Sequence, residues 1–475
     1  IYEDAMGKPV ITKDGVTVAE SVVLYDPVEN IGATLIKEAA KNTVKEAGDG
    51  TTTATVLADS LLKNAYEKLE HNSIREIKAG IESGGKKVEK YLDKIKKEVK
   101  GDMLRHVATI STNNDAKLGE IISSAYEAVG KHGVVLMEES GDESTYFDLV
   151  DGVQFDSGLK SQNFATDEDR VKSELDKPYV LIVASPIPNI RKIQSVLEHV
   201  IKNNSSILIV ASVEQQPYQV LMTNKLKGNL KVNVVDLPGF GAGKRDAIDD
   251  LAILTGAKVI DESLGDDMDL IDASFLGRAV KSITDSKNTI LTIDEIPEEA
   301  KERIDLVEKK IKEEKNPYIK TKLEQRLAML SGAVAVIKVG GSSKIELKEK
   351  KDRVEDAIYA VKAALQEGIV PGGGVALMNA ARTLEFNDLG EFIFAKSILA
   401  PFNTILSNAS IEIPGGFDYK PGFGIDVVTG KPVNMVKAGI IDPVLVTKTA
   451  LKNAISVVNT IISADCVISN KRINQ

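Results

Sequence analysis

The spacing of apolar residues changes along the chain and divides it into regions of different predicted structure. From Ile31 to Lys100, apolar residues recur at intervals of three and four, which predicts a bundle of long amphipathic helices. From Tyr179 onward, apolar runs such as YVLIVAS and SILIVAS alternate with amphipathic segments such as IRKIQSVLEHVIKN. This alternation predicts a parallel sheet connected by crossover helices.

The remainder of the chain returns to helical spacing. The charged stretch Glu298–Leu330 is interrupted at Asn316 and Pro317, which predicts two antiparallel helices joined by a turn. The run AVAVIKVG then predicts a strand, followed by a helix over Leu347–Glu367 and helical texture to the C-terminus. The chain is therefore predicted to pass from a helical bundle to an α/β region and back to a bundle.

Composition limits the class of protein. A chain of 475 residues, 43% of them hydrophobic and 27% charged, is long enough for about three domains. Its net charge of −10, without a basic stripe, counts against a nucleic-acid partner. Its apolar runs are shorter than the roughly 20 residues of a membrane helix, and no signal peptide is evident. We expect a soluble protein without membrane or nucleic-acid partners.

The few cysteine and histidine residues exclude two further kinds of site. Cys466 is the only cysteine, so no internal disulfide can form, and the chain fits a reducing compartment. The four histidines lack the spacing of zinc ligands. We expect a cytoplasmic protein, or one in an equivalent compartment such as an organelle matrix or the cytoplasm of an infected cell.

The segment AGDGTTTATVLA carries the clearest candidate for chemistry. Glycines flank Asp49 directly before a predicted helix, where unpaired N–H groups and the helix dipole favour a bound phosphate. The hydroxyls of Thr51, Thr52 and Thr53 add donors. Asp49 can hold Mg²⁺, which prefers one or two carboxylates together with phosphate and water oxygens. The alternative is a threonine-capped helix start after a glycine turn, and the pattern alone leaves both interpretations open.

Other short segments add residues of the same kind. In ITKDGVTVA, Lys13 and Asp14 occupy the tight turn of a predicted hairpin. VPGGGVAL repeats the glycine-rich helix entry at Gly373, RVEDAIYAV places Asp356 on an amphipathic helix, and GIIDPVLV places Asp442 before a proline, where its default role is a helix N-cap. Each residue has an ordinary structural explanation when it is taken alone. Their occurrence together favours a composite nucleotide site.

Several ordered segments resemble those of the group I chaperonins, the GroEL-type family, across nearly the whole chain. They are ITKDGVTVA, AGDGTTTATVLA, ATISTNND, DGVQFDSG, LPGFG, LEQRLAMLSGAVAVIKVGG, KEKKDRVEDAIYAVKAALQEGIVPGGGVAL and AGIIDPVLVTKTAL. The chain resembles a divergent member with incomplete termini. The family's N-terminal phosphate-contacting turn and its glycine-methionine tail have no counterpart in it, and the stretch between Glu385 and Asn434 is shortened.

The resemblance implies a multidomain α and α/β fold with nested insertions. A helical equatorial domain would comprise residues 1–96 and 368–475, a small α/β intermediate hinge domain residues 97–150 and 334–367, and an α/β apical client-binding domain residues 151–333. Such nesting accounts for the helical periodicity at both ends of the chain, because motifs from both ends must meet in one equatorial ATP site.

The resemblance also implies a role for each candidate residue. Asp49 is similar to the acid that holds magnesium, and Asp442 to the acid that receives the ribose hydroxyls. Asp356 would orient the attacking water when the intermediate domain moves, with Asp14 assisting across the γ-phosphate. The remaining predicted contacts to ATP are Lys13, Gly50, Thr51, Thr52, Thr53, Gly373 and, for the nucleobase, Asp426.

In the apical region the resemblance implies an apolar groove that captures unfolded chains and for which a co-chaperonin lid competes. The predicted lining residues are Leu159, Phe164, Ile193, Val196, Leu197, Tyr218, Leu221 and Met222. The alternative is that several of them, Val196 and Leu221 above all, form the buried faces of their helices. Polar residues replace the family's usual apolar ones at Lys160, Asn163, Gln194 and Thr223. These replacements count against standard lid binding and broad client capture.

Of two charge pairs found in the family, this chain lacks one and keeps the other. Ser157 and Lys344 stand where the family pairs an arginine with a glutamate between neighbouring subunits, so ring cooperativity is expected to differ. Asp115 and Arg353 keep the opposite charges that would latch the intermediate domain within one subunit.

These observations predict an ATP-dependent, ATP-hydrolysing chaperone that uses Mg²⁺, binds non-native client proteins and forms homo-oligomeric rings, heptameric and either single or double. ATP binding would tilt the intermediate domain and lift the apical groove from its client. A passive holdase or assembly scaffold is the main alternative, but it would have no use for Asp14, Asp49 and Asp356 together. A small-molecule enzyme built on the α/β region is a weaker one, because the chain lacks G-x-G-x-x-G and a catalytic His or Cys constellation.

Overall fold

The computed structural model divides the chain into two compact units. The first comprises Ile1–Ser124, Met137–Tyr146 and Ile337–Gln475, and the second comprises Ala125–Leu136 and Phe147–Val336. The structure describes all residues except 1, 4–6, 8, 11, 13–14, 131–132, 168–170, 239–243, 315–318, 320–322, 324–325, 328, 331–332, 414, 416, 418–419 and 470–475. The predicted boundaries of equatorial, intermediate and apical domains are finer than this division and stay a prediction.

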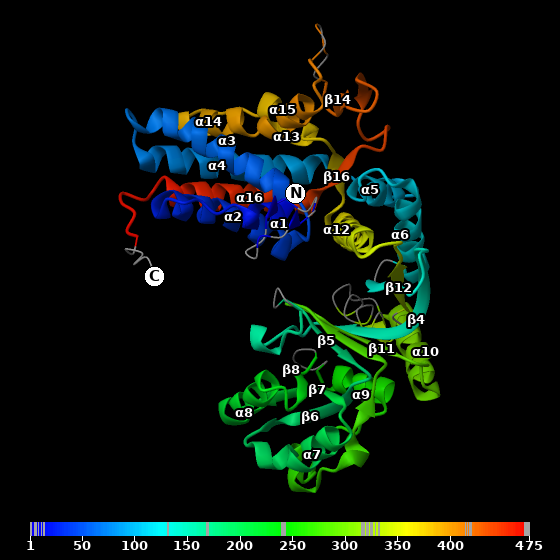
Figure 1. Cartoon of the computed structure of the whole chain (residues 1–475). Coiled ribbons are helices and arrows are strands. Elements are labelled where there is room, and N and C mark those ends of the chain that lie inside the picture. Colours follow the sequence, from blue (N-terminus) through cyan, green and yellow to red (C-terminus); the bar gives the residue numbers. More distant parts are fainter. Residues whose placement is uncertain are drawn as a thin grey trace. The chain divides into compact units, whose positions relative to one another are not determined.

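The first unit is a bundle whose long helices have nearly parallel axes in Figure 1. These helices are α2 (Pro27–Ala47), α3 (Thr51–Leu69), α4 (Ile74–Ile95) and α16 (Val444–Ile461). The same unit contains α1 (Gly15–Ser21), α5 (Met103–Ser111), α12 (Lys344–Glu367), α13 (Val375–Thr383), α14 (Leu389–Ser397) and α15 (Ala400–Asn408), and α6 (Ala116–Val129) begins in it.

Local signals and a shared core account for these helices. α2 begins after Asp26, whose Oδ1 accepts the N–H groups of Val28 and Glu29 at 2.7 and 3.0 Å, and it ends at the left-handed Gly48. The buried positions of α3 recur at intervals of three and four and are Thr51, Ala54, Leu57, Ala58, Leu61 and Ala65. The apolar ones join side chains of α4, α13, α14 and α16 in one core. The predicted helical bundle is therefore confirmed.

Short strand pairs bring distant parts of the first unit together. β13 (Ile369–Pro371) pairs antiparallel with β16 (Ile441–Pro443), so that Val370 lies opposite Asp442. β14 (Phe423–Asp426) pairs with β15 (Lys431–Asn434), and β1 (Tyr2–Glu3) pairs with β2 (Pro9–Val10).

The hairpin predicted around residues 13 and 14 is wrong in its second arm. Gly15–Ser21 forms the helix α1 instead of a strand. Because α1 packs against α2 and α3, tertiary contacts outweigh the strand propensity of its valines and threonine. Lys13 and Asp14 themselves lie outside the described residues.

One stretch of the described residues, Leu389–Asn408, is long and apolar enough to cross a membrane by length and composition. Half of this stretch is buried inside the protein, and α14 within it packs against α3 and α4. The core of the bundle therefore accounts for its apolar character.

A buried carboxylate joins α14 to α4. The Glu391 side chain is 3% exposed and lies 2.7 Å from Nζ of Lys87. It also accepts hydrogen bonds from the Ser83 hydroxyl at 2.6 Å and from the Asn387 N–H at 2.7 Å. Burial alone would raise the pKa of Glu391, but these hydrogen bonds and the Lys87 charge lower it to about 2. The ionised carboxylate thus holds α14 against α4.

The second unit is built on two sheets. The larger has the strand order β3 (Val134–Glu139), β12 (Ala333–Val339), β4 (Tyr146–Phe155), β11 (Thr289–Ile293), β10 (Lys281–Thr284) and β5 (Ser173–Asp176). The smaller has the order β8 (Lys231–Val235), β7 (Ser206–Val213), β6 (Tyr179–Ile187) and β9 (Gly277–Arg278). The end residues of β3 and β12 and the first residue of β4 are counted in the first unit.

The smaller sheet confirms the predicted alternation of strands and helices. β6, β7 and β8 are parallel, with Tyr179 opposite Ile207 and Ser206 opposite Lys231. The accompanying helices are α7 (Gln194–Lys202), α8 (Gln215–Leu226) and α9 (Lys244–Thr255), and Figure 1 draws them around these strands. Single 3₁₀ turns occur at Gln162–Phe164 (η1), Ile190–Ile193 (η2), Glu262–Leu264 (η4), Met268–Leu270 (η5) and Ala273–Phe275 (η6).

The charged stretch begins with the predicted helix, α10 (Glu298–Glu313), whereas the predicted break at residues 316 and 317 lies outside the described residues. The fully buried Asp250 of α9 accepts hydrogen bonds from Arg303 at 2.6 Å and from Nε of Arg326 at 2.7 Å. A shared buried carboxylate therefore holds both parts of the charged stretch to α9.

Glu391→Gln is expected to lower the free energy of unfolding at pH 7 by about 2–3 kcal/mol, because it removes the charge that binds Lys87. The folded-state pKa of about 2 lies below the usual 4.5, so this stabilisation is present above about pH 4.5 and is lost as the pH falls toward 2. The difference in the free energy of unfolding between wild type and variant, measured by urea unfolding, should therefore be smaller at pH 3 than at pH 7.

Glu67→Gln serves as the control, because Glu67 forms an exposed pair with Lys396 at 4.0 Å and should contribute under about 0.5 kcal/mol. An equal loss of unfolding free energy in Glu391→Gln and Glu67→Gln at pH 7 would contradict the stabilising role of Glu391.

Candidate functional site

The turn between α2 and α3 is built from left-handed glycines around Asp49. Gly48 and Gly50 have φ angles of 75° and 90°, and a Cβ atom on Gly50 would lie 2.6 Å from Cγ1 of Val446. Gly50 is the N-cap of α3 and has no side chain to accept its first N–H groups. The threonine-capped alternative is therefore wrong, and within the turn the Asp49 carboxylate accepts the Gly50 N–H at 2.5 Å.

A second glycine turn lies at the start of α13. Gly374, with a φ of 75°, is the N-cap of this helix and likewise offers no side-chain cap. The N–H groups of Gly373 and Gly374 donate hydrogen bonds to the Asp442 carboxylate, which the β13–β16 pairing brings opposite. Asp442 does not cap α16, as its position had predicted, because Pro443 occupies the N-cap and Asp442 lies in the strand before it.

The two acids Asp49 and Asp442 repel one another across this site. Burial and, next to it, the negative charge of Asp49 raise the pKa of Asp442 to about 7, although hydrogen bonds from Gly373 and Gly374 lower it. The described residues contain no group of three or more His, Cys, Asp or Glu that could hold a metal alone. Mg²⁺ fits this arrangement, because it compensates excess negative charge and takes most of its ligands from phosphates and water.

The residue after Asp14 and the helix that carries Asp356 both contact the Asp49 turn or the threonines that follow it. A Cβ atom on Gly15 would lie 2.5 Å from Oγ1 of Thr51 and 2.8 Å from Oγ1 of Thr52, so the chain next to Asp14 contacts the threonine run. Asp356 is partly buried on α12, one turn before Tyr359, which contacts Gly48. The structure thus brings together Asp49, Gly50, the threonines, Gly373 and Asp442 with the helix that carries Asp356.

Asp426 has a local role in the structure. Its two carboxylate oxygens accept the N–H of Val428 at 3.0 Å and the hydroxyl of Thr429 at 2.8 Å, both in the turn between β14 and β15. These bonds stabilise the hairpin turn, and the predicted nucleobase contact stays a prediction.

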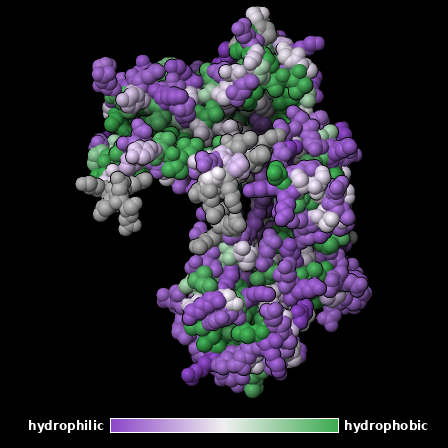
Figure 2. Space-filling view, in the orientation of Figure 1, coloured by the Kyte–Doolittle hydropathy of each residue, from purple (hydrophilic) through white to green (hydrophobic). Residues whose placement is uncertain are grey.

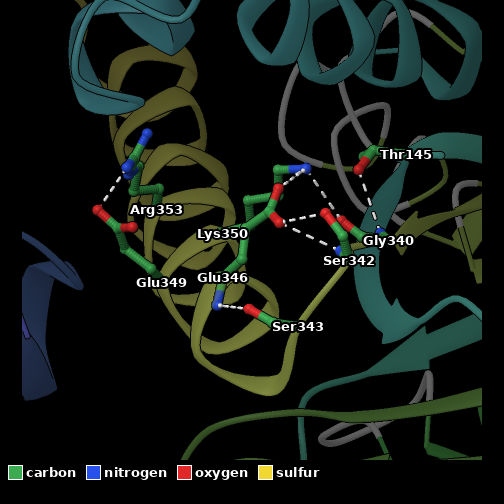
Figure 3. A network of polar contacts seen from close by, with 8 residues as sticks. All are labelled: Thr145, Gly340, Ser342, Ser343, Glu346, Glu349, Lys350 and Arg353. Carbon is green, nitrogen blue, oxygen red and sulfur yellow. Dashed lines mark hydrogen bonds and ion pairs between the residues drawn. The ribbon is translucent and has the colours of Figure 1, made fainter. Parts of the chain in front are cut away.

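The start of α12 is fixed by a polar network that is shown in Figure 3. The Ser343 Oγ caps the helix by accepting the Glu346 N–H at 3.2 Å. The Glu346 carboxylate accepts the Ser342 hydroxyl at 2.6 Å and lies 2.9 Å from Nζ of Lys350, and these bonds lower its pKa to about 2. Lys350 also donates to the Gly340 carbonyl at 3.2 Å. The helix entry is therefore tied to the end of β12.

The predicted latch between Asp115 and Arg353 is absent from this structure. Arg353 pairs with Glu349 on its own helix at 2.5 Å, as Figure 3 shows, and Asp115 accepts the N–H groups of Lys117 and Leu118 at the start of α6. Both residues therefore bond to groups close in sequence instead of to one another.

The predicted client-binding residues divide into buried and partly exposed ones. Phe164, Ile193, Val196, Leu197 and Leu221 are buried in the core between β6–β8 and their helices. For these five the prediction of an open groove is wrong, because they are the inner faces of their elements. Leu159, Tyr218 and Met222 remain partly exposed, and Figure 2 shows apolar surface over α8 framed by hydrophilic residues.

A residue that sequence reasoning missed holds η1 against α8. Nζ of Lys225 donates to the Ala165 carbonyl at 2.7 Å and lies 5.8 Å from the centre of the Phe164 ring, which itself packs edge-on against Tyr218 at 5.4 Å. Burial lowers the pKa of Lys225 to about 8. The amphipathic pattern gave no signal for it, because a lysine in a helix is expected at the solvated face.

The comparison with known proteins decides the family. Residues 1–472 match the model of the TCP-1/cpn60 chaperonin family. The chain belongs to this family. Family membership confirms the predicted chaperonin fold, the function as an ATP-dependent chaperone and the ATPase activity, and it does not separate group I from the other chaperonins.

Two crystal structures resemble this chaperonin. Both are of the chaperonin gp146 from the bacteriophage EL 2 (Pseudomonas aeruginosa), in the presence of ATP-BeFx. Crystal form II has a TM-score of 0.70 and 22% identity and covers 97% of this chain and 92% of that chain. Crystal form I has a TM-score of 0.61 and 22% identity and covers 97% of this chain and 91% of that chain. At this identity the likeness shows the fold.

Asp442→Asn is expected to stabilise the nucleotide-free chaperonin above pH 7, because it removes a charge that Asp49 repels and keeps an oxygen for the glycine N–H groups. The folded-state pKa of about 7 lies above the usual 3.8, so the wild type loses stability as the pH rises from about 4 to 7. The variant should unfold in urea at pH 8 with a free energy higher by about 1–3 kcal/mol and match the wild type at pH 4.

Asp426→Asn is the control for this prediction, because its carboxylate belongs to the β14–β15 turn and its loss should not stabilise the chaperonin. A wild type as stable as Asp442→Asn at pH 8 would contradict the charge repulsion.

Proposed function

We propose that this chaperonin binds Mg²⁺-ATP between the Asp49 and Gly373 turns and that hydrolysis there drives the release of bound non-native proteins. The carrying observation is that two helices, α3 and α13, start at glycine caps next to two carboxylates that repel one another. Helix N-termini attract phosphate oxygens, and the excess negative charge attracts a divalent cation. The family membership supports the same nucleotide chemistry.

Different residues of the site bind the metal, the phosphates and the ribose of the nucleotide. When bound, Mg²⁺ neutralises charge on the phosphate oxygens. Asp49 supplies its carboxylate ligand, and the N–H groups and hydroxyls of Thr51, Thr52 and Thr53 bind the phosphates. Gly373 lets the nucleotide approach the backbone closely, and Asp442, held by the N–H groups of its neighbouring turn, accepts the ribose hydroxyls.

Hydrolysis needs a positioned water as well as a bound nucleotide. Asp356 orients this water from α12, and movement of α12 gates the step. Asp14 assists across the γ-phosphate, a role that is supported by the contact of the adjacent Gly15 with Thr51 and Thr52. Lys13 is proposed to contact ATP from the same turn. The nucleobase contact of Asp426 has the weakest support, because both of its oxygens bind the β14–β15 turn.

The family also supports an assembly and a set of partners. We propose rings of identical subunits, seven to a ring as in group I, in the cytoplasm or an equivalent reducing compartment. Clients bind to the partly exposed Leu159, Tyr218 and Met222 rather than to the buried residues of α7 and α8. Gln194 bonds the exposed Glu198 at 2.7 Å beside this surface, and its polarity argues for a cycle without an obligatory co-chaperonin.

A holdase that binds clients without hydrolysis is the competing function. A holdase would not need an acid that a separate helix holds near the phosphate turn. Asp356 occupies such a position, since α12 contacts Gly48 one turn beyond it. The site therefore favours the hydrolytic cycle.

Asp356→Ala is expected to lower kcat for ATP hydrolysis by about 100-fold or more and to leave the Kd for ATP within a few-fold of wild type, because it removes only the group that orients water. Steady-state phosphate release and calorimetric binding of Mg²⁺-ATP measure the two effects. Asp352→Asn, one turn earlier on α12, is the matched control and should keep wild-type kcat. Unaltered hydrolysis in Asp356→Ala with intact ATP binding would sink the assigned role, and a wild type without ATPase activity would favour the holdase.

Tyr218→Ser combined with Met222→Ser should weaken capture of denatured, reduced lysozyme several-fold and lower the melting temperature less than loss of a fully buried side chain does, because both side chains are partly exposed. Val196→Ser should lower the melting temperature of the second unit instead, because Val196 is fully buried. Aggregation suppression and thermal unfolding measure these effects. Undiminished capture by the double variant would place the client surface elsewhere.

A further inference from the structure

The ring of Tyr359 rests on the backbone of the phosphate turn. Gly48 is buried and has a φ of 75°, and a Cβ atom placed on it would lie 2.3 Å from Cγ, 2.4 Å from Cβ and 2.7 Å from Cδ1 of Tyr359. Real Cβ atoms do not approach other atoms so closely, so only glycine allows α12 to come this near to the turn. The contact is made by the base of the side chain, where little conformational freedom remains.

The same face of α12 carries both this contact and Asp356. Residues three and four apart lie on one face of a helix, so Asp356, Tyr359 and Ala363 form a single row. Ala363 packs with Ala47 and Val446, the residues that flank the turn on α2 and α16. These three residues therefore lie along the turn. Ala363 packs with Ala47, Tyr359 contacts Gly48, and Asp356 lies one helical turn before Tyr359 on α12.

The ends of α12 are held separately from this middle contact. At the C-terminal end, Glu367 lies 3.0 Å from Nζ of Lys448 on α16. Near the N-terminal end, Lys351 lies 2.7 Å from Glu139 at the end of β3. These ion pairs tie α12 to α16 and to β3, its inner face packs on α5 and α16, and Tyr359 adds the contact with the turn itself.

We propose that Tyr359 is a positioning residue for ATP hydrolysis: its ring, seated on Gly48, sets the distance between the Asp356 carboxylate and the phosphate turn. The proposal rests on the assignment of Asp356 to the attacking water under the proposed function. Loss of the ring allows α12 to settle or rotate on the turn, and a displacement of about 1 Å in a reacting group costs on the order of 100-fold in rate. Nucleotide affinity is expected to change little, because the groups that bind ATP lie on the Asp49 turn, α3, the Gly373 turn and β16, and none of them is on α12.

The test compares three substitutions of Tyr359 in the full chain. Tyr359→Ala removes the Cγ and Cδ1 contacts and is expected to lower kcat by about 10- to 100-fold while the Kd for Mg²⁺-ATP changes less than about threefold. Tyr359→Phe keeps every ring atom that contacts Gly48 and should retain kcat within about twofold. Tyr359→Leu keeps Cβ, Cγ and one δ carbon but not the rest of the ring, so its kcat should lie between those of the Ala and Phe variants. A Phe variant as slow as Ala would overturn the proposal, because the effect would then come from the hydroxyl, and so would wild-type kcat in the Ala variant.

A double-mutant cycle with Gly48 tests the contact itself. Gly48→Ala should slow hydrolysis because its methyl group would lie 2.3 Å from Cγ and 2.4 Å from Cβ of Tyr359. Tyr359→Ala removes the Cγ clash but keeps the Cβ, so the double variant should recover part of the loss and cost less than the product of the two single effects. Fully multiplicative effects would overturn the proposed contact.

Asp356→Ala, assayed in parallel, separates this proposal from the proposed function. If Asp356→Ala hydrolyses ATP normally, the assignment of Asp356 fails whatever Tyr359 does. If Asp356→Ala is inactive and Tyr359→Ala is fully active, only the positioning role fails.

Discussion

The arrangement of the first unit depends on holding two mutually repelling carboxylates, Asp49 and Asp442, at one site. The β13–β16 pairing places Asp442 opposite Val370 and within reach of the glycine N–H groups, while α2 and α3 present Asp49 from the other end of the chain. Without a ligand the repulsion is a cost that the helical core must cover. A phosphate-bound cation at the proposed site would remove this cost and so stabilise the unit.

The close approach of α12 to the Asp49 turn connects this site to the rest of the unit. Gly48 and Gly50 leave room for Tyr359 and Val446, and small residues such as Ala47 and Ala363 complete the contact. At its other end α12 is tied to β12 and β3 through Lys350 and Lys351. One helix therefore contacts the Asp49 turn at its middle and β12 and β3 near its start.

The sequence allowed the prediction of much of this fold, because helical periodicity, strand alternation and glycine-flanked turns are local signals. Prediction from the sequence failed where tertiary packing determines the local structure. The valines of α1 favour a strand by propensity, yet they form a helix that packs on α2 and α3. Asp442 looked like an N-cap, but strand pairing turned it toward Gly373. Phe164 and Val196 resembled groove residues, and only the packed sheet shows them to be buried.

The central claim is that Asp49, the threonine run, Gly373 and Asp442 form one site for a metal-bound nucleotide. The most direct measurement is an experimental structure of the chaperonin with a slowly hydrolysed ATP analogue and Mn²⁺, located by its anomalous signal. The account predicts the Mn²⁺ peak within coordination distance of the Asp49 carboxylate, with the phosphates at the N-terminus of α3. Mn²⁺ and nucleotide bound away from Asp49 and Asp442 would contradict it.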